Sequence, residues 1–308
     1  MIIAVVILTL ILLLVTLFAF IGTDITVMRR KHPIIFTSKR ITESRFDTMF
    51  EDDIKRGREW IASVPCREQE ITSYDGTSLF GRFYQNGDSK QTVLLLHGYR
   101  SDPIHDFSCA FKFYFDKGFN LLVPDQRAHG RSGGRFITYG VRERYDAKCW
   151  MEQINRLVPD GDIYANGVSM GASTLLMATS LDLPENLRGI IADCGFTSPG
   201  AIIKKVIKEN MHLPVFPVYN VIRLMTRLVA RFDFEEYSAV TAVRESKVPI
   251  LMLHGREDCF VPFSMGEEIF EAAGGKKQAV WVEGADHGCS FMIDRESCTK
   301  ALYGFLGI

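Results

Sequence analysis

The sequence predicts an α/β protein: a mostly parallel, doubly wound sheet with an inserted helical lid, preceded by one N-terminal transmembrane helix. Three observations support this fold class. Six short apolar runs alternate with helical stretches, which is the pattern of strand–helix–strand units. The segment between Asp193 and Lys247 interrupts this alternation, and residues 1–22 contain no charged side chain.

Residues 1–22, MIIAVVILTLILLLVTLFAFIG, are apolar on every face of a helix. At 1.5 Å per residue, a helix of this length spans the ~30 Å hydrocarbon core of a bilayer. A cleavable signal peptide would need a basic start, a shorter apolar stretch and small residues at a cleavage site, and this segment has none of them. We therefore expect residues 1–22 to be a single membrane anchor.

Flanking charge predicts the orientation of this anchor in the cell membrane. No basic residue precedes it, and six follow it closely: Arg29, Arg30, Lys31, Lys39, Arg40 and Arg45. Since basic residues stay on the cytoplasmic side, the folded domain is expected in the cytoplasm and the N-terminus outside. Seven cysteines without a CxxC pair agree with a reducing compartment.

Residues 23–65 are interpreted as a juxtamembrane linker with a charged helix around 46–61, and residues 66–308 as the globular domain. Residues 70–87 indicate two strands joined by a turn at Asp75–Gly76. Apolar runs without alternation, typical of strands buried on both faces, cover 91–98, 119–125, 162–167, 187–193, 248–255 and 278–284. Helical stretches separate them at about 104–117, 140–158, 170–181, 263–273 and 290–305.

Such a sheet places a ligand site at the carboxyl ends of its strands. Residues 197–247 have helical character but no strand pattern, so we expect a lid over these strand ends. Within it, residues 218–232 place Arg223, Arg227 and Arg231 four residues apart, as one stripe beside a broad apolar face. Two interpretations stay open: the helix rests on anionic headgroups, or it covers the strand ends with its arginines in solvent.

A G-x-S-x-G motif joins a predicted strand to a predicted helix, in Gly167-Val168-Ser169-Met170-Gly171. This context is typical of a nucleophile held on a tight turn. The two glycines remove side chains that would block such a turn. Ser169 then lies at a helix N-terminus, where free N–H groups favour developing negative charge.

A serine hydroxyl needs a base, and in this motif class the chain order is serine, acid, histidine. Asp258 follows the strand at 248–255, and His287 follows the strand at 278–284. Both therefore belong to loops at the same sheet edge as Ser169. Ser169 is the expected nucleophile, His287 the proton acceptor and donor, and Asp258 the residue that orients the imidazole.

Several residues compete for the roles of acid and base. Glu257 neighbours Asp258, Asp286 neighbours His287, and Asp193 ends the preceding strand. The remaining histidines with strand-end positions are expected to make turn hydrogen bonds: His97, His129 and His254. The oxyanion needs two donors, for which we predict the backbone N–H groups of Met170 and Tyr99.

These motifs resemble the serine α/β-hydrolase superfamily, whose fold would cover about residues 70–305. The resemblance rests on LLLHGY, GVSMGA, HGREDCFVP and GADHG, in this order. PDQRAHGRSGG and GVRERYD look like the membrane-anchored prolyl-oligopeptidase-like or esterase-like branch, where the first is a structural turn. The propeller of large oligopeptidases and the HGGG pattern of some esterases are missing. The resemblance implies hydrolysis of an ester, a thioester or an amide.

The favoured hypothesis is a membrane-anchored serine hydrolase that cleaves an acyl ester of a small molecule or lipid through an acyl-enzyme. One alternative is a small serine peptidase or amidase, and another is a non-catalytic, membrane-tethered binding protein on a hydrolase scaffold. A formal net charge of −1 provides no basic field for nucleic acid. No ligand spacing or phosphate-binding glycine motif occurs, so no metal or cofactor is expected.

Overall fold

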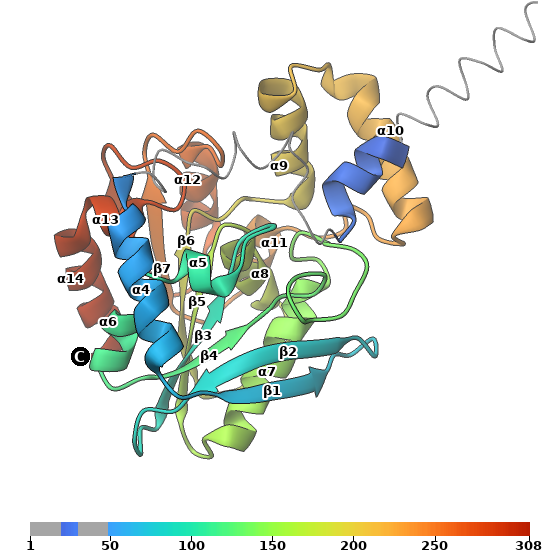
Figure 1. The fold of residues 1–308 in the computed structure, drawn as a ribbon. Coiled ribbons are helices and arrows are strands. Elements are labelled where there is room, and N and C mark those ends of the chain that lie inside the picture. Colours follow the sequence, from blue (N-terminus) through green and yellow to red (C-terminus); the bar gives the residue numbers. More distant parts are fainter. Residues whose placement is uncertain (1–19, 30–48) are drawn as a thin grey trace, which may run out of the picture.

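In a computed structural model of the chain, residues 20–29 and 49–308 are described (Figure 1). Of the expected membrane anchor at 1–22, residues 1–19 lie outside the described residues, and so does part of the expected linker, 30–48. Within the two described ranges, no helix is both long and apolar enough to cross a membrane.

An eight-stranded sheet forms the centre of the domain, with strand order β1-β2-β4-β3-β5-β6-β7-β8. β2 runs antiparallel to both of its neighbours, and all other neighbouring pairs are parallel. The predicted mostly parallel sheet is therefore confirmed. The strands are β1 (Arg67–Thr72), β2 (Ser78–Tyr84), β3 (Gln91–Leu96), β4 (Asn120–Pro124), β5 (Asp162–Val168), β6 (Leu187–Asp193), β7 (Ile250–Gly255) and β8 (Lys277–Val282).

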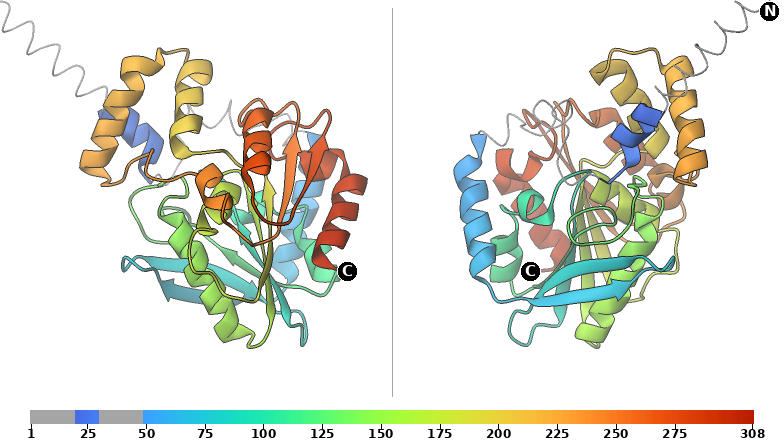
Figure 2. Two further views of the ribbon diagram at one scale, coloured as in Figure 1. Left: turned by 180° about the vertical axis from the view of Figure 1, so that it is seen from behind. Right: turned by 45° about the vertical axis from the view of Figure 1, so that its right-hand side comes forward.

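Helices cover both faces of this sheet (Figures 1 and 2). Leu94 and Leu96 of β3 belong to one hydrophobic core, and Val93 and Leu95 to the other. This alternation explains why β3 reads as a continuous apolar run, since both of its faces are buried. α7 (Glu143–Leu157), α8 (Met170–Ala178) and α12 (Phe263–Ala272) contribute to the first core; α4 (Glu51–Ser63), α6 (Phe111–Asp116) and α14 (Arg295–Leu306) contribute to the second.

Two expected helices are each divided in two. The stretch 104–117 forms α5 (Pro103–Asp106) and α6, because α4 packs against the break: a Cβ on Gly57 would lie 1.9 Å from the Ser108 carbonyl oxygen. The stretch 290–305 forms α13 (Ser290–Ile293) and α14. Asp294 separates these two helices and caps α14 by accepting a hydrogen bond from Ser297 N at 3.0 Å.

The segment between β6 and β7 contains α9 (Pro199–Lys205), the π-helical turn η1 (Val206–Asn210), α10 (Val215–Val229) and α11 (Ala239–Val243). α11 packs against α8 and α12 as part of the first core. Residues 199–229, which contain α9, η1 and α10, project above the strand ends, and we call them the cap (Figures 1 and 2).

The expected single helical stripe of Arg223, Arg227 and Arg231 is wrong. α10 ends at Val229, so Arg231 lies beyond the helix, with a φ of 55° where the chain turns back. Arg223 donates two hydrogen bonds to Asp233, at 2.6 and 2.8 Å. Asp233 lies outside the predicted helix, so its partnership with Arg223 depends on the turn that follows α10.

The DQRAHGRS turn is held by a buried ion pair. Arg127 donates to both carboxylate oxygens of Asp146 at 2.6 Å, and their side chains are 3% and 5% exposed.

Arg127→Met should lower the free energy of unfolding by about 3–5 kcal/mol, because Asp146 would stay buried without its partner. Urea unfolding measures this change. As a control, Arg188→Met removes a largely exposed ion pair with Asp162 and should change the urea midpoint of unfolding little. Equal losses of unfolding free energy in the two variants would contradict the prediction.

Candidate active site

Ser169 occupies a strained turn between β5 and α8. Its φ of 54° and ψ of −112° lie in a region that side chains other than glycine rarely adopt. The flanking glycines permit this turn: a Cβ on Gly167 would lie 2.4 Å from the Gly171 carbonyl carbon, and one on Gly171 would lie 1.9 Å from the Leu96 carbonyl oxygen. The predicted reason for these glycines is therefore confirmed.

The structure brings Ser169, His287 and Asp258 together at the carboxyl edge of the sheet. Ser169 Oγ lies 3.0 Å from His287 Nε2, and His287 Nδ1 lies 2.8 Å from Asp258 Oδ2. With the Nδ1 proton donated to the carboxylate, Nε2 is left free to accept the serine proton. The arrangement can therefore activate a hydroxyl nucleophile.

Electrostatics favour an ionised acid beside a basic imidazole. Asp258 Oδ1 accepts hydrogen bonds from the backbone N–H groups of Phe260 (2.9 Å) and Val261 (2.7 Å). Burial opposes the charged form of Asp258, but His287 and His254, whose Nε2 lies 3.3 Å from Asp258 Oδ2, hold the pKa of the carboxyl well below its usual range. Burial also disfavours a charged His287, but the adjacent Asp258 outweighs burial and raises the pKa of the imidazole.

This electrostatic arrangement predicts the pH dependence of any hydrolysis that uses Ser169 and His287. The imidazole must be neutral to accept a proton, so kcat/KM should fall as the pH drops through the pKa of His287. Because that pKa is raised, we expect the midpoint of the acid limb above about pH 6.5. Asp258→Asn removes the charge that raises the pKa of His287, so the midpoint of the acid limb should move to lower pH. The plateau value of kcat/KM should also be lower. Identical midpoints for both chains would contradict the assignment.

The competing acids have other partners. Asp193 accepts a hydrogen bond from Ser290 Oγ at 3.3 Å, and burial raises the pKa of its carboxyl to about 6. Asp286 accepts hydrogen bonds from Cys259 N at 3.0 Å and from His287 N at 2.7 Å. These bonds connect the loop that carries Asp258 to the loop that carries His287. Glu257 is exposed. The carboxylate that contacts the imidazole is that of Asp258.

The other strand-end histidines make the turn hydrogen bonds that their positions predict. His129 Nδ1 bonds to the carbonyl of Arg127 at 2.9 Å, and its Nε2 accepts from Arg100 N at 2.9 Å. His97 Nε2 accepts from Gln126 N at 3.0 Å, and His254 Nε2 lies 3.0 Å from the Val261 carbonyl oxygen. Burial lowers the pKa of His97 to about 4 and that of His129 to about 3, so both are neutral near pH 7.

The two predicted oxyanion donors belong to backbone that borders the nucleophile. Met170 is the first residue of α8, so its N–H has no acceptor within the helix. Tyr99 follows β3, and the preceding Gly98 is so close that a Cβ there would lie 3.4 Å from Ser169 Cβ. Arg100, the next residue in this loop, has a φ of 55°, and its backbone N–H donates a hydrogen bond to His129 Nε2.

Residues 20–29 pack against the loop that contains Tyr99 and Arg100, although their sequence predicted part of the anchor and of the linker. Tyr99 Oη donates to the Thr26 carbonyl at 2.7 Å, and Arg100 Nη2 donates to the Ile25 carbonyl at 2.6 Å. Val27 is fully buried, and its carbonyl accepts from Ile137 N at 2.7 Å. The only sequence signal was a β-branched run, Ile25-Thr26-Val27, which is unusual for a flexible linker.

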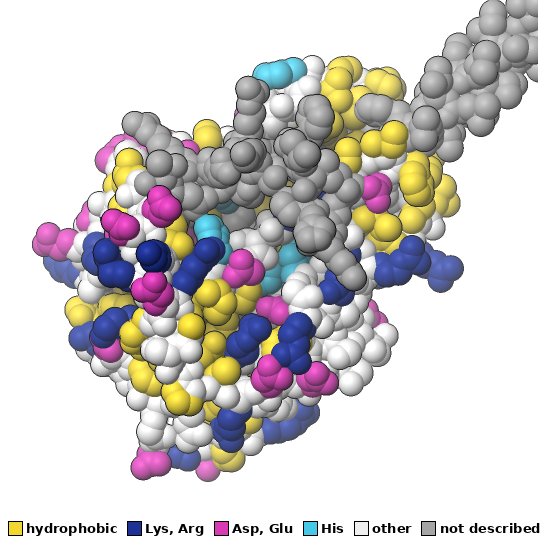
Figure 3. Space-filling view, viewed as in Figure 1, with side chains coloured by type: hydrophobic (Ala, Val, Ile, Leu, Met, Phe, Trp, Pro, Cys, Tyr) yellow, Lys and Arg dark blue, Asp and Glu magenta, His cyan; other side chains and the backbone are white. Residues whose placement is uncertain are grey.

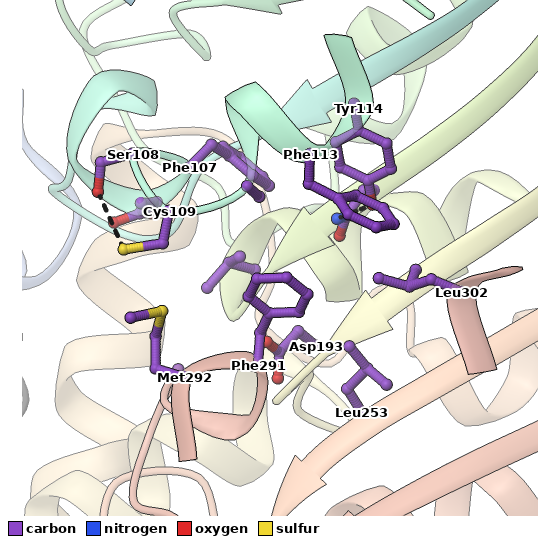
Figure 4. Close-up of a pocket in the computed structure, with 15 residues that line it drawn as sticks. Phe107, Ser108, Cys109, Phe113, Tyr114, Asp193, Leu253, Phe291, Met292 and Leu302 are labelled. Atoms are coloured by element: carbon purple, nitrogen blue, oxygen red, sulfur yellow. Dashed lines mark hydrogen bonds between the residues drawn. The ribbon is translucent and has the colours of Figure 1, made fainter. Parts of the chain in front are cut away.

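A small cavity lies behind the strand ends, between α6, α13 and the ends of β5 and β6 (Figure 4). Its volume of about 50 Å³ suits a water molecule rather than an acyl chain. Asn166 Nδ2 donates to Tyr114 Oη at 2.7 Å, while Asn166 Oδ1 is buried without a partner among the described residues. Asp193 also lines this cavity, so a water there would find two acceptors.

One group of side chains has the composition of a metal site. Cys194, Asp258 and His287 place ligand atoms within 4.8 Å of one another. Cys194 Sγ lies 4.0 Å from His287 Nε2, but Asp258 Oδ2 already contacts His287 and Oδ1 accepts from two backbone N–H groups. A cation would have to break the contacts that orient the imidazole, so this group is better explained as the surroundings of the triad.

Comparisons with known proteins agree with this architecture. A family model described as the alpha/beta hydrolase fold matches residues 91–217. The uncharacterized protein YqkD of Bacillus subtilis is 26% identical over 279 residues, covering 89% of this chain and 90% of that protein. An esterase of Pyrococcus furiosus, Pf2001, superposes with a TM-score of 0.66 at 24% identity, covering 80% and 92% of the two chains. An esterase of Exiguobacterium antarcticum superposes with a TM-score of 0.57 at 18% identity, covering 78% and 99%.

Proposed function

We propose that this chain, a member of the α/β hydrolase superfamily, is a serine hydrolase that cleaves an acyl ester through Ser169, His287 and Asp258. The observation that carries the proposal is the continuous hydrogen-bonded series Ser169–His287–Asp258 on three strand-end loops. The strained turn at Ser169 supports the nucleophilic role, because backbone strain of this kind collects at functional sites.

The reaction follows from this geometry. His287 Nε2 takes the proton as Ser169 Oγ attacks the acyl carbonyl carbon, and the N–H groups of Met170 and Tyr99 stabilise the resulting oxyanion. Collapse breaks the ester C–O bond, and the departing alkoxide takes the proton from His287. Water then attacks the acyl-enzyme with its proton going to His287, and the carboxylic acid leaves as Ser169 recovers its proton.

The choice of an ester is supported by the solved structures that share the fold. Two of these structures are described as esterases, from Pyrococcus furiosus and Exiguobacterium antarcticum. The triad would also suit a small peptidase or amidase, and a non-catalytic binding protein would need no triad at all. Assays of esters and peptide amides, together with labelling of the serine, distinguish these alternatives.

The same proposal includes a single membrane anchor at residues 1–22 and a cytoplasmic catalytic domain. Its support is the uncharged apolar span and the basic residues that follow it. Protease added to intact cells should leave the domain uncut and should digest it once the membrane is permeabilised. Digestion in intact cells would place the domain outside.

The test of the reaction compares substrates on the purified full-length chain. A chain-length series of esters and a panel of peptide amides are assayed side by side, and the serine is labelled with a fluorophosphonate probe. We expect labelling together with faster turnover of esters than of amides. Comparable turnover of peptide amides would favour a peptidase, and neither labelling nor turnover would favour a binding protein.

A further inference from the structure

Exposed hydrophobic side chains are concentrated on two segments of the surface. The described residues contain ten exposed large hydrophobic side chains, and six of them lie on residues 20–21 and on the cap. Single exposed hydrophobic residues are common, whereas a cluster marks an interaction site. We call these six residues the cap face: Phe20, Ile21, Met211, Phe216, Leu224 and Leu228.

The two segments of the cap face are packed against each other. Gly22 lies so close to α10 that a Cβ there would be 3.0 Å from the side chain of Ile222. Figures 1 and 2 show residues 20–29 beside α10 in every view, and Figure 3 shows hydrophobic side chains gathered over this part of the surface. Residues 20–22 therefore lie beside α10, the helix that carries Leu224 and Leu228.

α10 has apolar side chains on its outer face as well as its inner one. Its inner face buries Tyr219, Ile222 and Thr226 against the domain. On its outer face, Leu224 is 55% exposed and Leu228 66% exposed. These two leucines are four residues apart and share one face of the helix. A helix that only covered the active site would bury a single apolar face, so the outer leucines need another partner.

The chain itself indicates which partner this is. Residues 1–19, which directly precede Phe20, are uncharged and mostly aliphatic. Hydrogen bonds from Tyr99, Arg100 and Ile137 hold residues 20–29 on the domain, so the position of Phe20 relative to the cap is defined. A bilayer that receives the residues before Phe20 must therefore approach the surface around Phe20, which is the cap face.

We propose that the cap face rests on the lipid bilayer, with Phe216, Leu224 and Leu228 in the interfacial region. The inference rests on the anchor of the proposed function and adds to it a defined orientation of the domain. In that orientation the cap lies between the catalytic serine and the lipid, where an acyl substrate would leave the bilayer. The contact is mainly apolar, because Arg223 is paired with Asp233 and Arg227 lies 3.6 Å from the same carboxylate.

Quenching by brominated lipid tests this orientation in the full-length chain. Tryptophan is introduced at Phe216 or Leu228, and as a matched control at Tyr74, which is 53% exposed on the loop between β1 and β2. In zwitterionic vesicles with brominated acyl chains, we expect more than half of the added emission to be lost at positions 216 and 228 and none at 74. Undiminished emission at 216 and 228 in vesicle-bound protein would overturn the proposal, as would failure of the chain to associate with vesicles.

Activity provides the second readout. Leu224→Gln combined with Leu228→Gln should lower hydrolysis of a long-chain ester embedded in the bilayer by about tenfold, because apolar contact with lipid is lost. Hydrolysis of a short soluble ester should stay unchanged. Tyr74→Gln combined with Ile293→Gln alters two exposed apolar residues outside the cap face and should change neither rate. Equal rates on embedded ester for wild type and the cap variant would contradict the inference.

The two proposals can fail separately. If no ester is hydrolysed by any chain, the proposed function fails, while the quenching result still decides the orientation. If quenching at positions 216 and 228 is absent and chemical cross-linking joins two cap faces, a second copy of the chain covers this surface, and the bilayer contact is wrong.

Discussion

Ser169→Ala should lower kcat/KM for ester hydrolysis by about 10⁴- to 10⁶-fold, and His287→Ala should do the same. Ser169 supplies the attacking oxygen, and His287 Nε2, 3.0 Å away, is positioned to take its proton. Because the two residues act as a unit, the double variant should lose little more than either single variant. Asp258→Asn should cost somewhat less, since the nucleophile and base remain. Steady-state kinetics on a soluble ester measure all four chains.

Cys194→Ala provides the matched control for the triad variants. Its thiol also lies near His287 Nε2, at 4.0 Å, but has no place in the reaction, so activity should stay close to that of wild type. Fluorophosphonate labelling distinguishes loss of the nucleophile from misfolding. Labelling that persists in Ser169→Ala would show that another residue is the nucleophile.

Removing residues 1–29 should reduce kcat/KM on a soluble ester by about 10²- to 10³-fold, the loss typical of a disturbed oxyanion donor. The segment 20–29 supplies the carbonyls that accept from Tyr99 and Arg100. Arg100 has a strained φ of 55° in the loop after β3 that carries the proposed donor Tyr99, which we call the oxyanion loop. Without those acceptors the loop keeps the hydrogen bond from Arg100 N to His129 but loses its side-chain contacts to residues 25 and 26. The effect should fall mainly on kcat, because these contacts position the donor of the transition state.

A chain that begins at Phe20 is the matched control, since it lacks only the residues before the docked segment. It should retain the soluble-ester activity of the full-length chain. A peptide covering residues 20–29, added in trans, should restore part of the activity of the shorter chain. Equal kcat/KM for chains that begin at Phe20 and Arg30 would show that the segment does not support the oxyanion loop.

Local sequence was sufficient where a structure depends on neighbouring residues. Every predicted strand formed, because apolar runs bounded by turn residues specify strands buried on both faces. The turn at Ser169 could also be predicted from the local sequence, because Gly167 and Gly171 leave room for a strained backbone within five residues. Chain order alone led to Asp258 and His287, and the structure places both beside Ser169.

Other features depended on residues far apart in the chain. The break between α5 and α6 exists because α4 packs on the Ser108 carbonyl, and no sequence pattern at residues 107–110 predicted it. The pairing of Arg223 with Asp233 required the chain to turn back after α10, which gave one arginine of the expected stripe a carboxylate partner.

By itself, then, the sequence of this protein determined the α/β fold class, the strand positions and the turn that carries Ser169, since each arises from periodicity or from a few adjacent residues. Only the tertiary structure decided that residues 20–29 pack against the loop that contains Tyr99 and Arg100. Their carbonyls accept hydrogen bonds from Tyr99, Arg100 and Tyr139, which lie more than seventy positions away along the chain. Backbone carbonyls are the same in every residue, so no side-chain pattern could have shown where these would bind.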